Sequence, residues 1–152
     1  MNFTENPELV TRPAAHYVYL ERVGQFPVIA PATWQDLHRL APMISKHNRI
    51  TGAMALYKVP NIYRAGFLLS SPPQELPPDV QYILWQGGKY SRFVLTGAYS
   101  NLPEASGRVW SIVARKQLQV RDDFAVEHYL NDPATTPEEQ LITEILVPTG
   151  EG

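Results

Sequence analysis

The chain has 152 residues, of which 44% are hydrophobic and 18% charged, so its length and composition are those of one globular domain. Thirteen basic residues against fifteen acidic ones give a net charge of −2, and no basic cluster suggests nucleic-acid or anionic-membrane binding. The absence of cysteine excludes disulfides and thiolate-bound zinc and fits a reducing compartment. Without a signal-peptide pattern or a long apolar run, we expect a cytoplasmic protein that does not enter a membrane.

Residues 1–13 are polar and marked by proline, so we expect a flexible lead-in followed by a single domain over residues 14–149. The first predicted strand covers residues 16–23 and ends near Gly24. A helix capped by Thr33 should follow, with Pro42 kinking or splitting it. Its predicted inner face is formed by Trp34, Leu37, Ala41 and Ile44.

The remaining elements are expected in the following order. Two strands, residues 53–59 and 64–70, are joined by a turn, and residues 80–85 and 90–96 are predicted to form a hairpin around Gly87-Gly88. Asn101 is expected to cap a second helix. A strand over 124–130, a helical turn that begins near Thr136 and a strand over 141–147 complete the chain.

The two halves of the chain resemble each other. Residues 23–26 and 96–99 each follow a strand and precede a proline, a helix and a tryptophan. This repetition predicts an α+β fold of two pseudo-twofold-related βαββ units, with an antiparallel sheet and two helices packed on one face.

Glu144 stands out in the last strand because both faces of that strand are apolar. Alternation places it between Ile142 and Leu146, so its carboxylate should be buried. A buried carboxylate must be paired, hydrogen-bonded or protonated. Two interpretations follow. In the first, Glu144 is paired with an arginine, a tyrosine or a backbone group, or it lies at an exposed edge. In the second, its carboxylate lies unpaired in an apolar pocket and binds a ligand.

The chain is also rich in aromatic side chains, which could line such a pocket. Aromatic faces with one desolvated carboxylate suit a flat, lipophilic guest, and a cationic guest especially. The four histidines lack metal-ligand spacing, and no phosphate-binding loop or nucleophile motif is present, so no metal and no cofactor are predicted. The candidate ligand-binding residues are Glu144, Tyr129, Trp110, Tyr90, Trp34, Tyr19, Tyr57 and Phe67.

The second half resembles the GyrI-like (gyrase-inhibitor-like) small-molecule-binding domain, which also forms the effector-binding half of AraC-type and MerR-type drug-responsive bacterial regulators. The similarity is carried by an ordered set of motifs. They are Gly88-Lys89-Tyr90, residues 93–105, Gly107, residues 129–133, residues 136–139, Thr143-Glu144-Ile145 and Val147-Pro148. The first half matches only through Gly24, Phe26 and the order of its elements.

The resemblance implies an SHS2-like duplication around a hydrophobic pocket, with Glu144 as the pocket carboxylate. It implies a stand-alone domain that senses or sequesters a small molecule, with multidrug binding and transcription regulation as the family context. The chain has Ala105-Ser106-Gly107 where the family often has Ala-Trp-Gly, so ligand preference does not carry over.

Two alternatives come with the family. One is hydrolysis of cyclopropane-bearing DNA-alkylating natural products, with Glu144 as general base and Tyr129 or another tyrosine polarising the conjugated carbonyl. The other is inhibition of DNA gyrase, which would make a protein the partner; a regulator is another such partner. For the empty pocket, burial predicts a raised pKa for Glu144.

Overall fold

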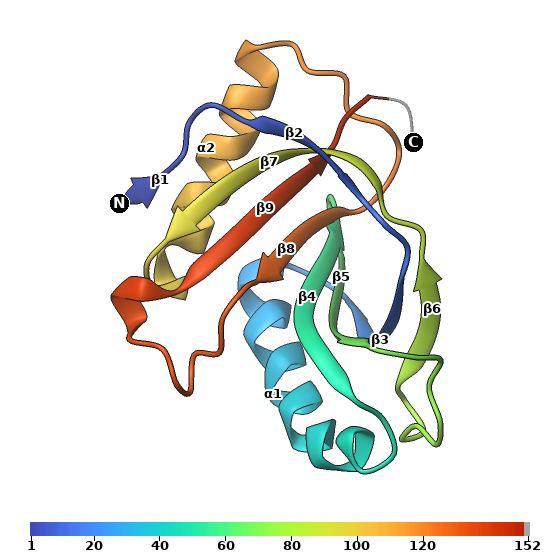
Figure 1. Cartoon of the computed structure of the whole chain (residues 1–152). Helices are drawn as coiled ribbons and strands as arrows, with labels where there is room; N and C mark the ends of the chain where they lie inside the picture. Colours follow the sequence, from blue (N-terminus) through green and yellow to red (C-terminus); the bar gives the residue numbers. More distant parts are fainter. Residues whose placement is uncertain (151–152) are drawn as a thin grey trace. The chain divides into compact units, whose positions relative to one another are not determined.

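The computed structural model, which describes residues 1–150, contains two compact units (Figure 1). The central unit is Pro13–Gly87. The terminal unit combines Met1–Arg12 with the described residues from Gly88 onwards. Both units are built from antiparallel strands and one α-helix, which confirms the predicted α+β class.

The central unit contains a four-stranded antiparallel sheet in the order β4-β5-β3-β6. Helix α1 packs against the sheet, and its buried side chains include Leu37 and Ile44 of the predicted inner face. Tyr17 packs on the opposite side of β3 from Val18, as alternation requires, and donates a 2.7 Å hydrogen bond to the carbonyl oxygen of Met54. The elements are β3 (Ala15–Val23), α1 (Phe26–Ser45), β4 (Ile50–Lys58), β5 (Ile62–Leu69) and β6 (Gln81–Trp85).

The terminal unit contains a sheet in which β7 and β9 are central, β8 pairs with β9, and β1 and β2 pair with the other edge of β7. Helix α2 lies across one face of this sheet (Figure 1). Its core consists of Phe93, Leu95, Ala105, Val109, Ile112, Val113, Ile145 and Val147. The helices and strands are β1 (Asn2–Phe3), β2 (Glu8–Arg12), β7 (Gly88–Thr96), α2 (Leu102–Arg115), β8 (Ala125–Tyr129) and β9 (Ile142–Pro148), with short 3-10 turns η1 (Tyr99–Asn101) and η2 (Glu138–Gln140).

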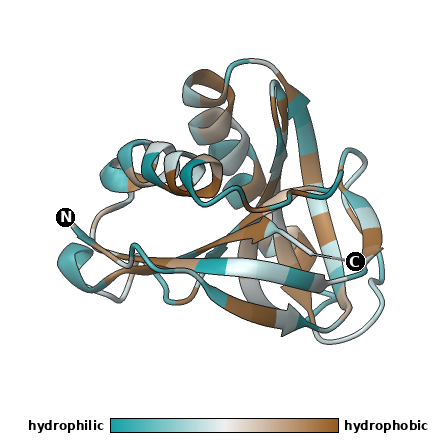
Figure 2. Cartoon of the chain, turned by 90° about the horizontal axis from the view of Figure 1, so that it is seen from above, coloured by the Kyte–Doolittle hydropathy of each residue, from teal (hydrophilic) through white to brown (hydrophobic). Residues whose placement is uncertain are grey.

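Each unit contains the element order strand, helix, strand, strand: β3-α1-β4-β5 in the central unit and β7-α2-β8-β9 in the terminal unit. The pseudo-twofold that would relate them, and the SHS2-like duplication, stay predictions. Figure 2 shows hydrophilic and hydrophobic residues side by side in both helices, as expected for helices with one buried face. Within residues 1–150, no helix is long and apolar enough to cross a membrane.

The N-terminal segment, expected to be a flexible lead-in, forms a structured edge of the terminal sheet. Leu9, Val10 and Thr11 pair with β7, and Thr4 fixes the chain between the two short strands. The Thr4 Oγ1 atom accepts a 2.8 Å hydrogen bond from the Val94 amide, and the Thr4 amide donates a 3.0 Å bond to the Val94 carbonyl oxygen. Polarity indicated a loop here, but an edge strand needs only one partner and tolerates polar side chains.

Three local predictions are wrong: the helix cap at Thr33, the split at Pro42 and the Gly87-Gly88 hairpin. Helix α1 begins at Phe26 and not after Thr33, whose Oγ1 atom donates a 2.6 Å hydrogen bond to the Ile29 carbonyl oxygen within the helix. Proline in the first turn of a helix is compatible with helix geometry, and the helix also continues through Pro42. The predicted Gly87-Gly88 hairpin is absent, because β6 pairs with β3 whereas β7 pairs with β1, β2 and β9.

Packing around Gly66 gives a test of the central unit. A Cβ atom at this position would lie 2.5 Å from the Val18 carbonyl oxygen and against the Tyr17 ring. The Val18 backbone is fixed by strand pairing, and the Tyr17 ring is fixed by the hydrogen bond from its hydroxyl to Met54. Since neither can move aside easily, we expect Gly66→Ala to destabilise the protein by about 1–3 kcal/mol in urea unfolding.

Gly107→Ala is the matched control, because nothing lies within 4 Å of its Cβ position in α2. We expect this variant to be stabilised by about 0.5–1 kcal/mol through helix propensity. Equal stability changes of the same sign in both variants would contradict the packing described for Gly66.

Candidate functional site

The terminal sheet has two chemically different faces. Along β9, Thr143, Ile145 and Val147 alternate with Ile142, Glu144 and Leu146, and the first set shares its side of the sheet with α2. We call the second side the Glu144 face. The residues directly opposite Glu144 on the neighbouring strands are Val94 of β7 and His128 of β8.

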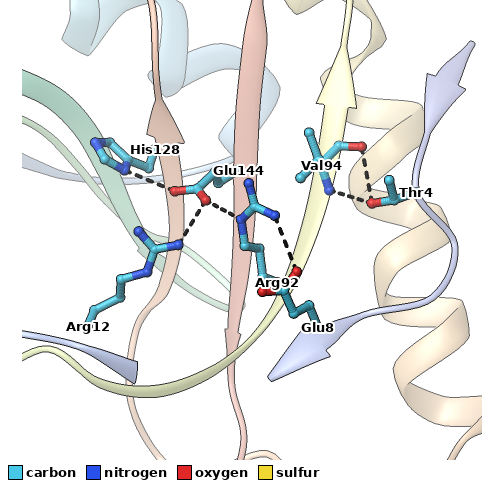
Figure 3. A network of polar contacts seen from close by, with 7 residues as sticks. All are labelled: Thr4, Glu8, Arg12, Arg92, Val94, His128 and Glu144. Atoms are coloured by element: carbon cyan, nitrogen blue, oxygen red, sulfur yellow. Dashed lines mark hydrogen bonds and ion pairs between the residues drawn. The ribbon is translucent and has the colours of Figure 1, made fainter. Parts of the chain in front are cut away.

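Three basic side chains contact the Glu144 carboxylate (Figure 3). Arg12 Nη2 donates a 2.8 Å hydrogen bond to Oε2, and Arg92 Nε donates to the same oxygen. His128 Nδ1 lies 3.2 Å from Oε1. Arg92 Nη1 is also 3.8 Å from an oxygen of Glu8, whose side chain is 70% exposed. Glu144 is 2% exposed, so its carboxylate is buried and paired.

The pKa of Glu144 follows from these contacts. Burial raises the pKa of Glu144. Hydrogen bonds from His128 and Arg92, together with the charge and hydrogen bond of Arg12, lower it by more than burial raises it, so the pKa falls to about 2. The expectation of a raised pKa in the empty protein is therefore wrong. Of the two interpretations of Glu144, the structure shows the one in which arginine satisfies the carboxylate.

Strand pairing brings these residues together from distant parts of the sequence. Arg92 lies opposite Leu146, two residues from Glu144 on the same face, and β2 places Arg12 beside β7. Sequence reasoning missed Arg12, Arg92 and His128 as site residues. Alternation with buried Phe93 placed Arg92 on a definite face, but nothing in the sequence indicated that residues 8–12 join the same sheet.

Apolar side chains lie next to the charged cluster. Val94 and Ile142 on the Glu144 face are partly exposed. Leu130, which follows β8 and is 44% exposed, donates its amide to the Ile142 carbonyl oxygen at 3.0 Å. The side chains of Arg12, Arg92 and His128 are 28%, 26% and 24% exposed, so solvent reaches these three basic groups although Glu144 itself is buried. The Glu144 face thus offers an apolar patch beside accessible hydrogen-bond donors.

A second carboxylate lies on the helix side of the sheet. Glu127 accepts a 2.8 Å hydrogen bond from the Tyr129 hydroxyl, and the Tyr129 ring meets the edge of Tyr99 at 5.3 Å. Burial raises the pKa of Glu127, and the hydrogen bond from Tyr129 offsets part of that rise. Tyr129 and Glu144 point to opposite faces, because Tyr129 pairs with Thr143 and His128 with Glu144.

The remaining predicted ligand-binding residues are dispersed. In the terminal unit, Trp110 belongs to α2 and packs against the core. Tyr90 lies two residues before Arg92 on the Glu144 face, where it is fully buried with the Arg121 guanidinium 4.9 Å from its ring centre. The other four belong to the central unit. Tyr19 stacks on Tyr17, Trp34 of α1 contacts Phe67 of the sheet, and Tyr57 contacts Phe26 of α1.

The described residues form open hollows, and two of them are considered for ligand binding. One, of about 480 Å³, lies in the terminal unit and is lined by Ala98, Tyr99, Ser100, Pro133, Thr136, Glu138 and Leu141. The other, of about 630 Å³, lies on α1 beside Gln35, His38 and Arg39. None of the eight predicted ligand-binding residues lines either hollow.

The family model that matches this sequence is the GyrI-like small molecule binding domain, over residues 5–149. The chain belongs to this family, which confirms the resemblance found in the sequence. No curated protein matches it significantly in sequence.

Solved structures share the fold at low sequence identity. The C-terminal domain of EcmrR matches with a TM-score of 0.80 at 13% identity, covering 100% of both chains. SAV2435 bound to tetraphenylphosphonium matches with a TM-score of 0.70 at 16% identity, covering 95% of this chain and 94% of that one. A structure described as a hydrolase from Listeria innocua matches with a TM-score of 0.63 at 13% identity, covering 96% and 92%.

The ion cluster predicts a pH dependence of stability. Because the folded-state pKa of Glu144 lies below its ordinary value of 4.5, its contribution is fully present above pH 4.5 and is lost as the pH falls towards 2. Lowering the Glu144 pKa from 4.5 to about 2 corresponds to a contribution of about 3 kcal/mol to the free energy of unfolding. We expect Glu144→Gln to lose stability at pH 7 and to depend less on pH between 4.5 and 2, as measured by urea unfolding at several pH values.

Glu8→Gln is the control, since this carboxylate is largely exposed and its nearest cation is 3.8 Å away. Its stability profile should follow that of the parent protein. Carboxyl NMR titration gives a direct check: a Glu144 pKa at or above 4.5 would contradict the network.

Proposed function

We propose that this protein binds a small molecule that has a lipophilic body and a polar end, in order to sense or sequester it. The observation that supports this proposal is the composition of the Glu144 face. There a partly exposed apolar patch, Val94, Ile142 and Leu130, adjoins the accessible donors of Arg12, Arg92 and His128. Membership of a small-molecule-binding family supports the same class of function.

The buried carboxylate contributes by holding the donors in place. Arg12 and Arg92 are long and flexible, and fixing both against one oxygen reduces the conformational entropy that ligand binding must otherwise remove. Glu144 acts in this proposal as a positioning residue. A flat apolar body would lie over Val94 and Ile142, where burial of apolar surface contributes about 25 cal/mol per Å².

SAV2435, which binds tetraphenylphosphonium, supports a lipophilic guest for this fold. EcmrR, whose C-terminal domain shares this fold, is also known in complex with DNA, which supports a sensing role in concert with a regulator. For this chain, a regulator as partner, gyrase inhibition and a cytoplasmic location are expectations from the sequence and family.

Hydrolysis is the second candidate, and a specific observation favours a carboxylate other than Glu144. A general base needs appreciable proton affinity, which a carboxylate with a pKa of about 2 lacks. Glu127 has a raised pKa and a phenol donor in Tyr129, which touches Tyr99 at the 480 Å³ hollow. In this case Glu127 would activate water and Tyr129 would position it, for a strained-ring substrate of the kind expected from the family.

The binding proposal is tested with 2-naphthamide, an uncharged probe with a flat apolar body. We expect amide chemical-shift changes on titration to concentrate at Val94, Ile142 and Leu130. Val94→Ser should weaken binding about three- to tenfold, since it removes apolar surface beside the cluster.

Val28→Ser is the matched control, because Val28 lies on α1 and is 67% exposed. It should leave the affinity unchanged. Perturbations scattered over the surface, or equal effects of the two valine variants, would overturn the proposed binding face. Mass analysis of a cyclopropane-bearing alkylator incubated with the protein tests hydrolysis: turnover lost in Glu127→Gln but retained in Glu144→Gln supports the second candidate.

A further inference from the structure

The charge of the cluster on the Glu144 face indicates what kind of polar end the ligand carries. Two guanidinium groups, Arg12 and Arg92, converge on the single oxygen Oε2 of Glu144. One carboxylate neutralises only one of them. Glu8 is the other acidic group at the cluster, but it is 70% exposed and 3.8 Å from Arg92, so water screens most of its effect. His128 adds a further positive charge whenever it is protonated.

The cluster also contains more hydrogen-bond donors than acceptors. An arginine carries five N–H donors, and a carboxylate offers about four acceptor positions. Glu144 already accepts from both arginines at Oε2 and faces His128 at Oε1. Within residues 1–150, the side chain of Arg12 has Glu144 as its single polar partner, which leaves most of its donors directed to solvent. The unsatisfied groups of the cluster are therefore donors, and acceptors are in short supply.

From this imbalance we propose that the ligand is a lipophilic anion, an aromatic or aliphatic carboxylate, whose carboxylate bridges Arg12 and Arg92 beside Glu144. The inference rests on the proposed function and names the ligand class for the same face. Planar guanidinium groups bind carboxylates through paired N–H···O bonds. A second carboxylate would bring the cluster to two cations and two anions.

A cationic guest fits this cluster poorly. To reach Glu144 it would have to displace the arginines from both sides of a buried oxygen, and it would then lie against two like charges. The sequence-based expectation of a cation assumed an unpaired carboxylate, and the pairing observed here removes that assumption.

Three probes with the same ring system separate the possibilities: 2-naphthoate, 2-naphthamide and 2-naphthylmethylammonium. We expect 2-naphthoate to bind about tenfold or more tightly than 2-naphthamide, and the ammonium probe to bind most weakly. Raising the salt concentration should weaken naphthoate binding and leave naphthamide binding nearly unchanged.

Arg12→Gln should reduce the preference for naphthoate over naphthamide to within a few-fold while preserving naphthamide binding. Arg12→Lys, which keeps the charge and loses the planar fork, should give an intermediate preference and serves if the glutamine variant folds poorly. Arg39→Gln, at a 72% exposed arginine of α1, is the control and should change nothing.

The outcomes separate the two proposals. Equal binding of the three probes, or preference for the ammonium probe, would overturn the anion inference and leave the lipophilic binding site intact. Failure of all three probes to bind would overturn the proposed function itself. An unchanged preference in Arg12→Gln would show that the cluster does not select the charge of the ligand.

Discussion

The contact between Glu144 and the two arginines is the constraint on which the terminal unit depends. It joins residues of β2, β7 and β9, and His128 adds β8, so four strands meet at one carboxylate. Buried ion pairs are costly to desolvate, and replacing them with apolar residues is often neutral or stabilising. The sheet already has an apolar core on its α2 side, and the proposed function gives the ion cluster on the other side a role in recognition. In the proposed function, the same few atoms serve both stability and binding.

Much of the fold was predictable from local patterns. Apolar alternation located β3, β4, β5, β8 and β9 to within a few residues, and the repeated strand-helix order indicated the α+β class. Pairing was harder, because which strands meet depends on contacts between distant segments. Gly87-Gly88 carries the positive φ angles expected of a tight turn, yet its flanking strands join different units. The polar segment 8–12 became a strand because β7 had a free edge to pair with.

The site was predictable only in its central residue. Alternation alone established that Glu144 is buried, but its protonation depends on His128, Arg92 and Arg12, of which Arg12 lies 132 positions away in the chain. The aromatic candidates are dispersed for a related reason: aromatic residues fill cores as readily as they line pockets. Tyr90 and Trp110 pack within the terminal unit, and Trp34 donates its indole N–H to Tyr63. With structural relatives sharing only 12–16% identity, the fold persists while the polar groups on it can differ.

The pairing of the N-terminal residues with β7 has a consequence for handling the protein. Strands β1 and β2 cover a row of β7 backbone groups that would otherwise be open to any extended peptide. Trimming the first dozen residues would uncover that row and invite edge-to-edge self-association. Strands β1 and β2 therefore protect this edge of β7 from edge-to-edge association.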